Sequence, residues 1–182
     1  MYRLAVALAL LIVGSPALAQ NIPSMPDSDK TPGVALRKVP DAKAAACLTD
    51  KVGDTVEVGD TITLEMICAD GYTKCIRNVA TATKQHVYDR YGLTGGNHTA
   101  YCDSDQGCEV DHLIALEIGG SNDEKNLWPE PYQGETLNAH VKDRLERWLH
   151  NEVCGGKMSL QDAQKEIATD WVASFRKHIG NN

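Results

Sequence analysis

The stretch 109–128, EVDHLIALEIGGSNDEKNLW, constrains the fold more than any other part of the sequence. Apolar and polar side chains alternate at its start, which indicates a short β-strand that carries the adjacent pair Asp111 and His112. The two glycines at 119–120 indicate a turn, and a second short run begins at Asn126. We therefore predict two antiparallel strands joined through this glycine turn.

Helical spacing follows the two predicted strands. Apolar residues recur on one face of 136–153, and a last helix is predicted from a Ser159 cap to about His178. The order strand, turn, strand, helix, with further elements on both sides, predicts the α+β class. The further elements before the central stretch are a helix over 42–48, a β-hairpin over 56–67, a strand over 75–79 and a helix over 81–91.

The first 19 residues are typical of a signal peptide. Arg3 gives a positive start, residues 4–13 are an unbroken apolar run, and Ala-Leu-Ala at 17–19 is a cleavage site between small residues. The apolar run is too short to span a bilayer, although an uncleaved N-terminal anchor is the rival interpretation. Four of the seven prolines lie in residues 20–40, which predicts a flexible linker before a single domain over 41–182. We expect a secreted or periplasmic protein.

All six cysteines follow the expected cleavage site, and their even number predicts three disulfides in an oxidising compartment. Many pairings are compatible with the sequence. Short separations favour Cys68–Cys75 and Cys102–Cys108 as local bridges, which would leave Cys47 with Cys154. A structural zinc site is the alternative, but no pair has the two-residue spacing of a zinc knuckle.

The charge of the chain limits how it could bind nucleic acid. The formal net charge is −7, and loss of Arg3 with the signal peptide, which holds no acidic residue, makes it −8. A nonspecific nucleic-acid-binding protein usually gains affinity from a basic surface. Any nucleic-acid role must therefore depend on a local basic patch, on a bound cation, or on both.

Asp111 and His112 suit the hydrolysis of a phosphodiester bond. A histidine titrates near neutral pH and can deprotonate the attacking water, while a divalent ion neutralises charge on the phosphoryl oxygens. Neighbouring strand residues point to opposite faces, so a strand end or a bulge is needed to bring both into one cleft. Asn126, fourteen residues after His112, would hydrogen-bond near it and fix the ring or the hairpin. The helix from about Asn138 would supply a further metal ligand.

The residues VDHLI at 110–114, the glycine pair, Asn126-Leu127 and His140 together resemble the His-Asn-His (HNH) endonuclease family. The resemblance implies a ββα-metal core within 109–146 that binds one divalent ion, Mg²⁺, Mn²⁺ or Zn²⁺. It implies that Asp111 binds the ion, His112 is the general base, Asn126 positions the base and His140 is the second ligand. The segments GGSNDEKNLWPEP and KDRLE are similar to a branch of small exported bacterial HNH-like proteins.

Two features depart from the HNH pattern. The interval from Asn126 to His140 is fourteen residues, longer than is usual in the family, which fits a loop inserted before the helix. Asn138, Asp143 and Glu146 therefore compete with His140, and we retain Asn138 beside it as a candidate metal ligand. The chain also lacks the paired CxxC motifs by which many HNH proteins bind structural zinc, and disulfides would replace them.

Lys142 and Arg144 on the same helix are candidates for binding phosphate groups. They alternate with Asp143 and Glu146, so a solvated helix face with salt bridges is the alternative. The predicted function is an exported, monomeric, disulfide-stapled endonuclease that cleaves DNA, or RNA, without binding a membrane. The rival prediction is a catalytically inactive HNH-like binding module, which the acidic net charge favours.

Overall fold

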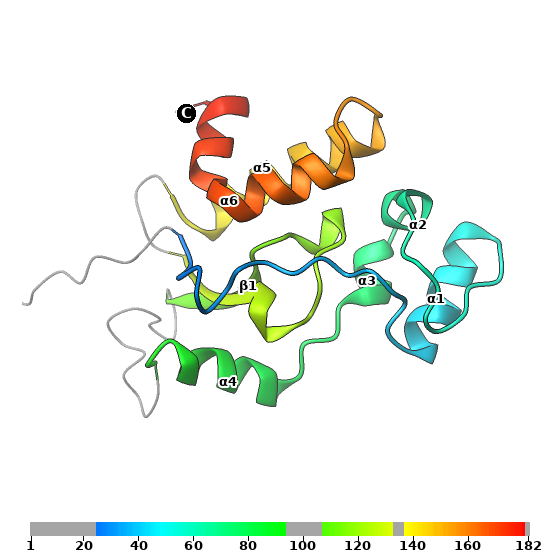
Figure 1. Ribbon diagram of the computed structural model, residues 1–182, viewed down its shortest axis with the longest axis horizontal. Helices are drawn as coiled ribbons and strands as arrows, with labels where there is room; N and C mark the ends of the chain where they lie inside the picture. Colours follow the sequence, from blue (N-terminus) through cyan, green and yellow to red (C-terminus); the bar gives the residue numbers. More distant parts are fainter. Residues whose placement is uncertain (1–24, 94–106, 133–136, 181–182) are drawn as a thin grey trace, which may run out of the picture.

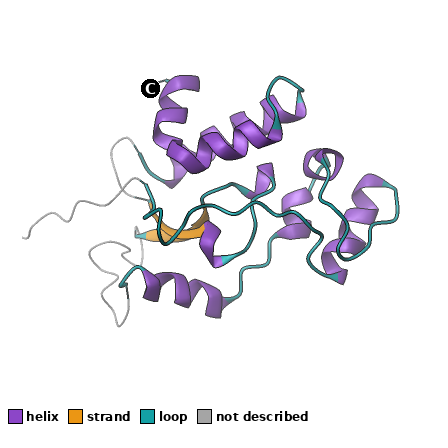
Figure 2. Cartoon of the chain, in the orientation of Figure 1, coloured by secondary structure: helices purple, strands orange, loops and turns teal. Residues whose placement is uncertain are grey.

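The computed structural model describes residues 25–93, 107–132 and 137–180 (Figure 1). A small antiparallel sheet lies between helix α4 and the packed pair α5 and α6, and three short helices, α1 to α3, form a second group (Figures 1 and 2). The elements in chain order are α1 (Ala42–Val52), α2 (Leu64–Cys68), α3 (Tyr72–Ile76), α4 (Thr81–Arg90), β1 (Cys108–His112), the 3₁₀ turns η2 (Leu116–Ile118) and η3 (Glu124–Asn126), β2 (Leu127–Pro131), α5 (Ala139–Cys154) and α6 (Leu160–His178).

Strands β1 and β2 pair antiparallel, with Asp111 opposite Trp128 and His112 opposite Leu127. All five residues of β2 are buried. Helix α4 packs on the strands, while Trp128 belongs to the apolar core that α5 and α6 share, so β2 is covered on both faces. The prediction of the α+β class, with two strands followed by a helix, is confirmed in this part of the chain.

The two glycines in the connection between the strands are required by close packing. Gly119 has a φ of 75°, in the left-handed region that glycine tolerates best. A Cβ atom on Gly120 would lie 1.7 Å from the carbonyl oxygen of Ile114. The turn predicted at 119–120 is therefore confirmed. A side chain at 120 would clash with the backbone, and one at 119 would be held in a strained backbone conformation.

Helix starts follow the capping residues in the sequence. Asp41 accepts a hydrogen bond from the Ala44 amide at the start of α1, and Ser159 accepts one from Asp162 at the start of α6. The helices predicted over 42–48, 81–91, 136–153 and 160–178 correspond to α1, α4, α5 and α6. These four predictions are confirmed, with shifts of a few residues at their ends.

The β-hairpin predicted over 56–67 is wrong. Val58 and Leu64 are exposed, by 57% and 47%, whereas a half-buried strand would have covered both. Thr63 instead caps α2 by accepting a hydrogen bond from the Met66 amide, and a single bridge pairs Lys38 with Thr61. The strand predicted over 75–79 is also wrong, because its first residues complete helix α3.

The flexible linker predicted over 20–40 is wrong for the part that the structure describes. Ala35 forms a β-bridge with Gly120, and the Leu36 amide donates to the carbonyl of Gly119. Thr31 is buried and donates to the carbonyl of Leu127. Residues 25–39 therefore pack across the central hairpin as part of the domain. The predicted signal peptide lies outside the described residues.

Two disulfides have both cysteines in the described residues, and they differ from the predicted pairs. Cys47 bonds Cys75, which joins α1 to α3, and Cys68 bonds Cys154, which joins α2 to the end of α5. The predicted pairs Cys68–Cys75 and Cys47–Cys154 are therefore wrong, because helix packing brings together cysteines that are distant in sequence. Cys108 is also disulfide-bonded, while Cys102 of its predicted pair lies outside the described residues. Disulfides are typical of an oxidising, non-cytosolic compartment.

Within the described ranges, no helix has both the length and the apolar composition needed to cross a membrane.

Candidate functional site

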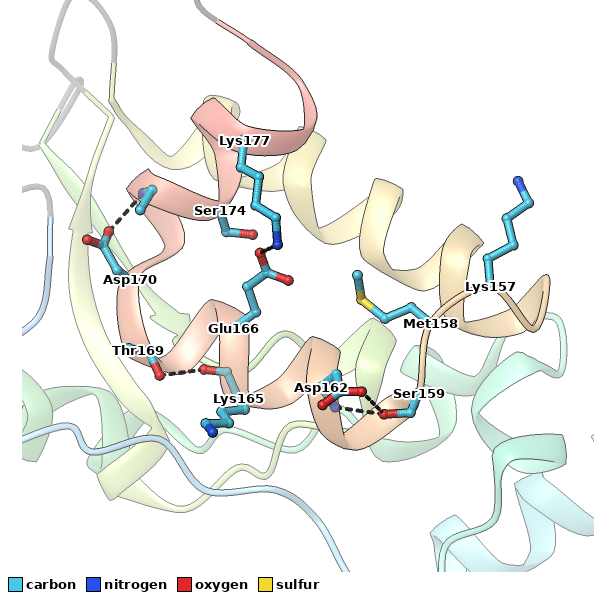
Figure 3. Close-up of a pocket in the computed structure, with 11 residues that line it drawn as sticks. Lys157, Met158, Ser159, Asp162, Lys165, Glu166, Thr169, Asp170, Ser174 and Lys177 are labelled. Atoms are coloured by element: carbon cyan, nitrogen blue, oxygen red, sulfur yellow. Dashed lines mark hydrogen bonds and ion pairs between the residues drawn. The ribbon is translucent and has the colours of Figure 1, made fainter.

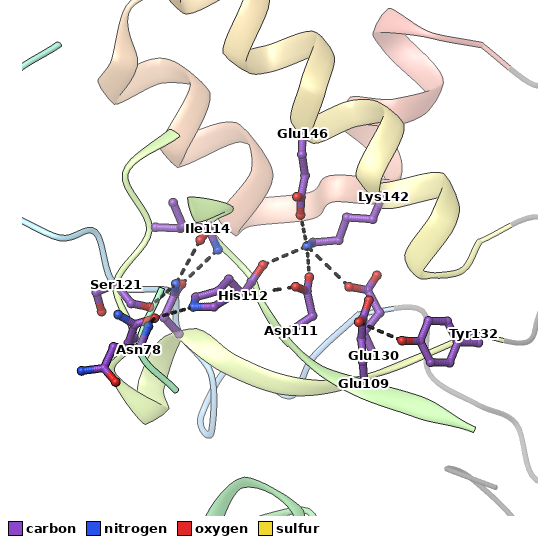
Figure 4. A network of polar contacts seen from close by, with 12 residues as sticks. Asn78, Glu109, Asp111, His112, Ile114, Ser121, Glu130, Tyr132, Lys142 and Glu146 are labelled. Atoms are coloured by element: carbon purple, nitrogen blue, oxygen red, sulfur yellow. Dashed lines mark hydrogen bonds and ion pairs between the residues drawn. The ribbon is translucent and has the colours of Figure 1, made fainter. Parts of the chain in front are cut away.

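A buried lysine lies at the centre of the polar groups beside the hairpin (Figure 4). Lys142, on α5, is fully buried. Its Nζ donates hydrogen bonds to Asp111 Oδ2 at 2.6 Å, to the carbonyl oxygen of His112 at 2.8 Å and to Glu146 Oε1. Glu130 Oε2 lies 3.4 Å from the same nitrogen. One ammonium thus contacts three carboxylates, which come from β1, β2 and α5.

The strand register explains why two of these carboxylates meet α5. Asp111 lies opposite Trp128, and Glu130 follows Trp128 by two residues, so all three share one face of the hairpin. Helix α5 lies over this face, with Lys142 and Glu146 one turn apart. The cluster of Asp111, Glu130, Lys142 and Glu146 is called the carboxylate–lysine cluster below.

Lys142 and Asp111 stabilise each other's charged form. Burial disfavours the charge on Lys142, but the carboxylates of Asp111, Glu130 and Glu146 raise its pKa well above the ordinary value. Burial would likewise raise the pKa of Asp111, yet the Lys142 ammonium holds that pKa well below its usual range. Both groups are therefore charged at neutral pH.

For Glu130 and Glu146, the charge of Lys142 does not offset the cost of burying a carboxylate. Burial raises the pKa of Glu130 well above its ordinary value and raises that of Glu146 to about 8. Glu130 is 1% exposed, and a hydrogen bond with Asp111 adds to the effect of burial on its pKa. The cluster thus contains more acidic groups than one ammonium neutralises.

His112 points away from this cluster, toward the loop between the strands. Its Nε2 lies 3.1 Å from Asn122 Oδ1, and the Asn122 amide nitrogen donates to the carbonyl of Ile76. Asn122 Oδ1 must therefore accept the bond, which assigns the proton of the neutral imidazole to Nε2. The ring's Nδ1 is then an acceptor, 4.0 Å from Asp111 Oδ1.

Burial lowers the pKa of His112 to about 4, and the exposed guanidinium of Arg77 acts in the same direction, although Asp111 and the Asn122 bond oppose them. The ring is 2% exposed, whereas the Asp111 side chain is 19% exposed. His112 is therefore a neutral base at physiological pH, and Asp111 marks the point where the site reaches solvent.

Asn126 is fully buried, and its side chain hydrogen-bonds the backbone of the loop and not the His112 ring. Its Oδ1 accepts hydrogen bonds from the amides of Val34 and Ile114, and its Nδ2 donates to the carbonyls of Ile114 and Ser121. The sequence suggested that Asn126 would fix either the ring or the hairpin, and its contacts fix the hairpin. The residue that contacts the ring is Asn122, which sequence reasoning missed.

The remaining predicted site residues have other contacts. Asn138 is the N-cap of α5 and accepts from the Val141 amide at 3.1 Å. His140 is exposed and its ring centroid lies 5.5 Å from that of Tyr132. The Arg144 guanidinium lies over the Phe175 ring, 5.3 Å from its centroid. Lys142, predicted to bind phosphate, is instead enclosed by carboxylates.

The predicted metal ion does not fit these side chains as they are arranged. The Lys142 ammonium fills the space between the Asp111, Glu130 and Glu146 carboxylates. Within 25–93, 107–132 and 137–180, no group of three or more His, Cys, Asp or Glu side chains is arranged to hold a metal ion.

A cavity of about 660 Å³ lies elsewhere, along α6 and the turn before it (Figure 3). Helix α6 is kinked there at Asp170, whose carboxylate accepts from the Ala173 amide. Lys177 on the cavity wall is paired with Glu166 at 3.0 Å. The Lys177–Glu166 pair and the Asp170 hydrogen bond thus both lie within α6 itself.

The low pKa of His112 predicts a pH dependence of stability in metal-free protein. Since the folded value of about 4 lies below the ordinary value of 6.5, the unfolded chain binds the proton more readily between them. The stabilising contribution is complete above pH 6.5 and is lost as the pH falls toward 4. It amounts to about 3 kcal/mol.

This contribution is measured by urea unfolding of wild type and His112→Gln, in EDTA, at several pH values across this range. When the pH falls from 6.5 to 4, wild type should lose about 3 kcal/mol of unfolding free energy relative to His112→Gln. A difference that stays constant with pH would contradict the low pKa.

Comparison with known proteins adds no family to this description. The chain matches no protein-family model, no curated protein and no solved structure.

Proposed function

We propose that the protein is an endonuclease that hydrolyses phosphodiester bonds in DNA or RNA, with His112 as the general base. The observation that carries the proposal is the state of His112. It is a neutral imidazole whose Nε2–H is fixed by Asn122, so that Nδ1 is available to accept a proton. The succession of two antiparallel strands and a helix, together with the HNH resemblance of the same residues, supports this choice.

The residues near His112 suggest how the reaction would proceed. Nδ1 takes a proton from water as the water oxygen attacks phosphorus and the bond from phosphorus to the leaving oxygen breaks; the leaving oxygen takes its proton from solvent. The resulting imidazolium is stabilised by Asp111, whose Oδ1 lies 4.0 Å away. Asn122 keeps the ring in the required tautomer. The exposed Arg77, whose charge acts on His112, is suited to bind the substrate phosphate. The divalent ion that the HNH resemblance implies, with Asp111, His140 and Asn138 as its ligands, would require Asp111 to give up its ion pair with Lys142 and Asn138 to give up its cap of α5.

The test is cleavage of supercoiled plasmid and of structured RNA by the exported protein, with Mg²⁺, Mn²⁺ or Zn²⁺ added, or with EDTA. His112→Ala should reduce the cleavage rate at least about 100-fold, because a general base contributes that much or more. His178→Ala is the matched control, since His178 pairs with Glu166 on α6, and it should retain the wild-type rate. If wild type leaves both substrates intact with every metal, or if His112→Ala cleaves as fast as wild type, the proposal fails.

A catalytically inactive binding module is the second candidate, and one observation favours it. The carboxylate–lysine cluster is enclosed, with Lys142 fully buried, as a structural ion-pair network would be. In that case no metal elicits cleavage, and His112→Ala and wild type behave alike in the same assay. The two candidates therefore separate in one experiment.

A further inference from the structure

We propose that the disulfide Cys68–Cys154 is a site of thiol–disulfide exchange, and that the cavity beside it takes a small thiol carrying a carboxylate and an ammonium group. The thiol opens the disulfide and forms a mixed disulfide with Cys68. The inference goes beyond the proposed function, because it concerns other residues and requires no nucleic acid.

The two disulfides whose cysteines both lie in the described residues differ in their access to solvent. Cys47 and Cys75 belong to the apolar core of the α1–α3 group, and Cys75 is 5% exposed. Cys154, in contrast, is an exposed residue at the end of α5, and its partner Cys68 is only partly buried at the end of α2. Access to a disulfide sulfur is one of the factors that set the rate of exchange. Cys68–Cys154 is therefore the more open of the two to attack.

A cavity of about 350 Å³ lies against Cys68, between the segment 67–73 and the α5 residues Arg147 and His150. Arg147 is exposed, and a guanidinium binds a carboxylate well. A second cation lies at the edge of the cavity, because a Cβ atom on its lining residue Gly71 would lie 3.2 Å from Lys51 Nζ. The cavity thus combines a disulfide cysteine with groups that attract an anion.

Acidic residues also line this cavity. Asp70 and Glu117 are among its lining residues, so the charges around it have both signs. A purely anionic thiol would be repelled by these two carboxylates, and a purely cationic thiol by Arg147. The thiol that complements the lining carries a carboxylate, for Arg147, and an ammonium group, for the acids. L-cysteine is a simple member of this class.

Helix α5 places a histidine beside the sulfur that would leave. The ring nitrogens of His150 lie 3.8 and 3.9 Å from Cys154 Sγ. Nδ1 also lies 2.7 Å from the carbonyl oxygen of Glu117, which can only accept, so Nδ1 carries a proton and the ring is held in place. An imidazole next to a sulfur favours its thiolate form, and a disulfide opens faster when the leaving thiolate is more stable. The geometry thus favours attack on Cys68, with Cys154 as the leaving group.

The exchange balances with two molecules of thiol. The first thiolate attacks Cys68 Sγ, the S–S bond breaks, and its electron pair leaves with Cys154 Sγ, which takes a proton from solvent. A second thiolate attacks the sulfur of the bound thiol, and Cys68 is released and protonated while the two small thiols depart as a disulfide. The protein gains two electrons and two protons, and α2 loses its covalent link to the end of α5 (Figure 1).

The test treats the oxidised protein with L-cysteine or with cysteamine, which lacks only the carboxylate. Iodoacetamide traps the thiols that form, and mass spectrometry identifies them. Cys68 and Cys154 should be alkylated about tenfold faster than Cys47 and Cys75, and the mixed disulfide should form on Cys68. A rate for Cys47 and Cys75 that equals or exceeds that for Cys68 and Cys154 overturns the proposal.

Variants test the cavity and the leaving sulfur. Arg147→Gln should slow opening by L-cysteine about threefold, as expected for an exposed ion pair, and should leave opening by cysteamine unchanged. His150→Gln should slow opening by both thiols. Arg176→Gln is the matched control, since Arg176 is exposed on α6 and does not line the cavity, and it should react as wild type does.

Two results with these variants would contradict the proposal. If Arg147→Gln changes the two rates by the same factor, or changes neither, the cavity does not recognise the carboxylate. If His150→Gln opens as fast as wild type with both thiols, Cys154 does not leave with the help of the imidazole. Nuclease activity enters none of these measurements, so a protein that cleaves no nucleic acid can still confirm the exchange site, and the reverse also holds.

Discussion

Replacing Lys142 with Met should lower the free energy of unfolding by about 3–5 kcal/mol at about pH 8 in metal-free buffer. The change removes the ammonium that contacts Asp111, Glu130 and Glu146 and leaves these three acidic groups facing one another in a largely buried site. Removing one partner of a buried ion pair costs far more than the pair itself contributes, since the remaining charge is uncompensated. Urea unfolding followed by circular dichroism measures the loss.

The loss should shrink when the pH is lowered to about 5, because protonation removes the charges that Lys142 otherwise balances. Glu130 and Glu146, whose pKa values burial already raises, take up protons first. Lys157→Met provides the matched control, since Lys157 is exposed and its contact with Glu152 spans 3.2 Å, and it should change stability by less than about 0.5 kcal/mol. A Lys142→Met protein within about 1 kcal/mol of wild type at pH 8 would show that the cluster is not a tightly coupled unit.

The role of Lys142 could not have been predicted from the sequence. Along α5 its charge alternates with those of Asp143 and Glu146, which is equally typical of a solvated helix face. Of its three carboxylate partners, only Glu146 lies on the same helix, four residues after Lys142. Asp111 and Glu130 reach it because the strand register places both on the face that α5 covers, and the register becomes known only with the fold.

Local signals predicted the fold where the physical cause is local. The Ser159 cap located the start of α6, and the Gly119–Gly120 pair located the turn between the strands. Residues 25–39 were misread because their proline content indicated a linker, whereas their backbone bonds go to Gly119 and Gly120, far along the chain. Cysteine pairing failed for the same reason, since it depends on how the helices pack.

The two asparagines of the loop illustrate the same limit within the site. Asn122 and Asn126 both lie in the segment SNDEKN, and the HNH resemblance selects Asn126. In the folded loop the two asparagines make different contacts. Asn126 is buried and bonds backbone groups of Val34, Ile114 and Ser121, while Asn122 contacts the His112 ring. A task that depends on the path of a loop between two strands cannot be assigned from spacing alone.

Replacing Asn126 with Ala should lower the free energy of unfolding by about 4 kcal/mol or more, and should loosen the loop that carries Asn122. The substitution removes hydrogen bonds to four buried or partly buried backbone groups, which belong to Val34, Ile114 and Ser121. Each buried group left without a partner costs about 1–3 kcal/mol, and the alanine methyl group can neither donate nor accept in place of the amide. Urea unfolding measures the loss.

The matched control is Asn151→Ala, because Asn151 is exposed on α5, and it should change stability by less than about 0.5 kcal/mol. Asn126→Asp is the more revealing variant. It keeps the acceptor for the Val34 and Ile114 amides and loses both donors, so it directs a carboxylate oxygen at the carbonyls of Ile114 and Ser121. We expect it to be at least as unstable as Asn126→Ala at neutral pH and to recover when acidified, since a protonated carboxyl group can donate again. If Asn126→Ala proved as stable as wild type, the loop would be held by its glycines and apolar contacts, and Asn126 would be free for the role at the base that the HNH resemblance implies.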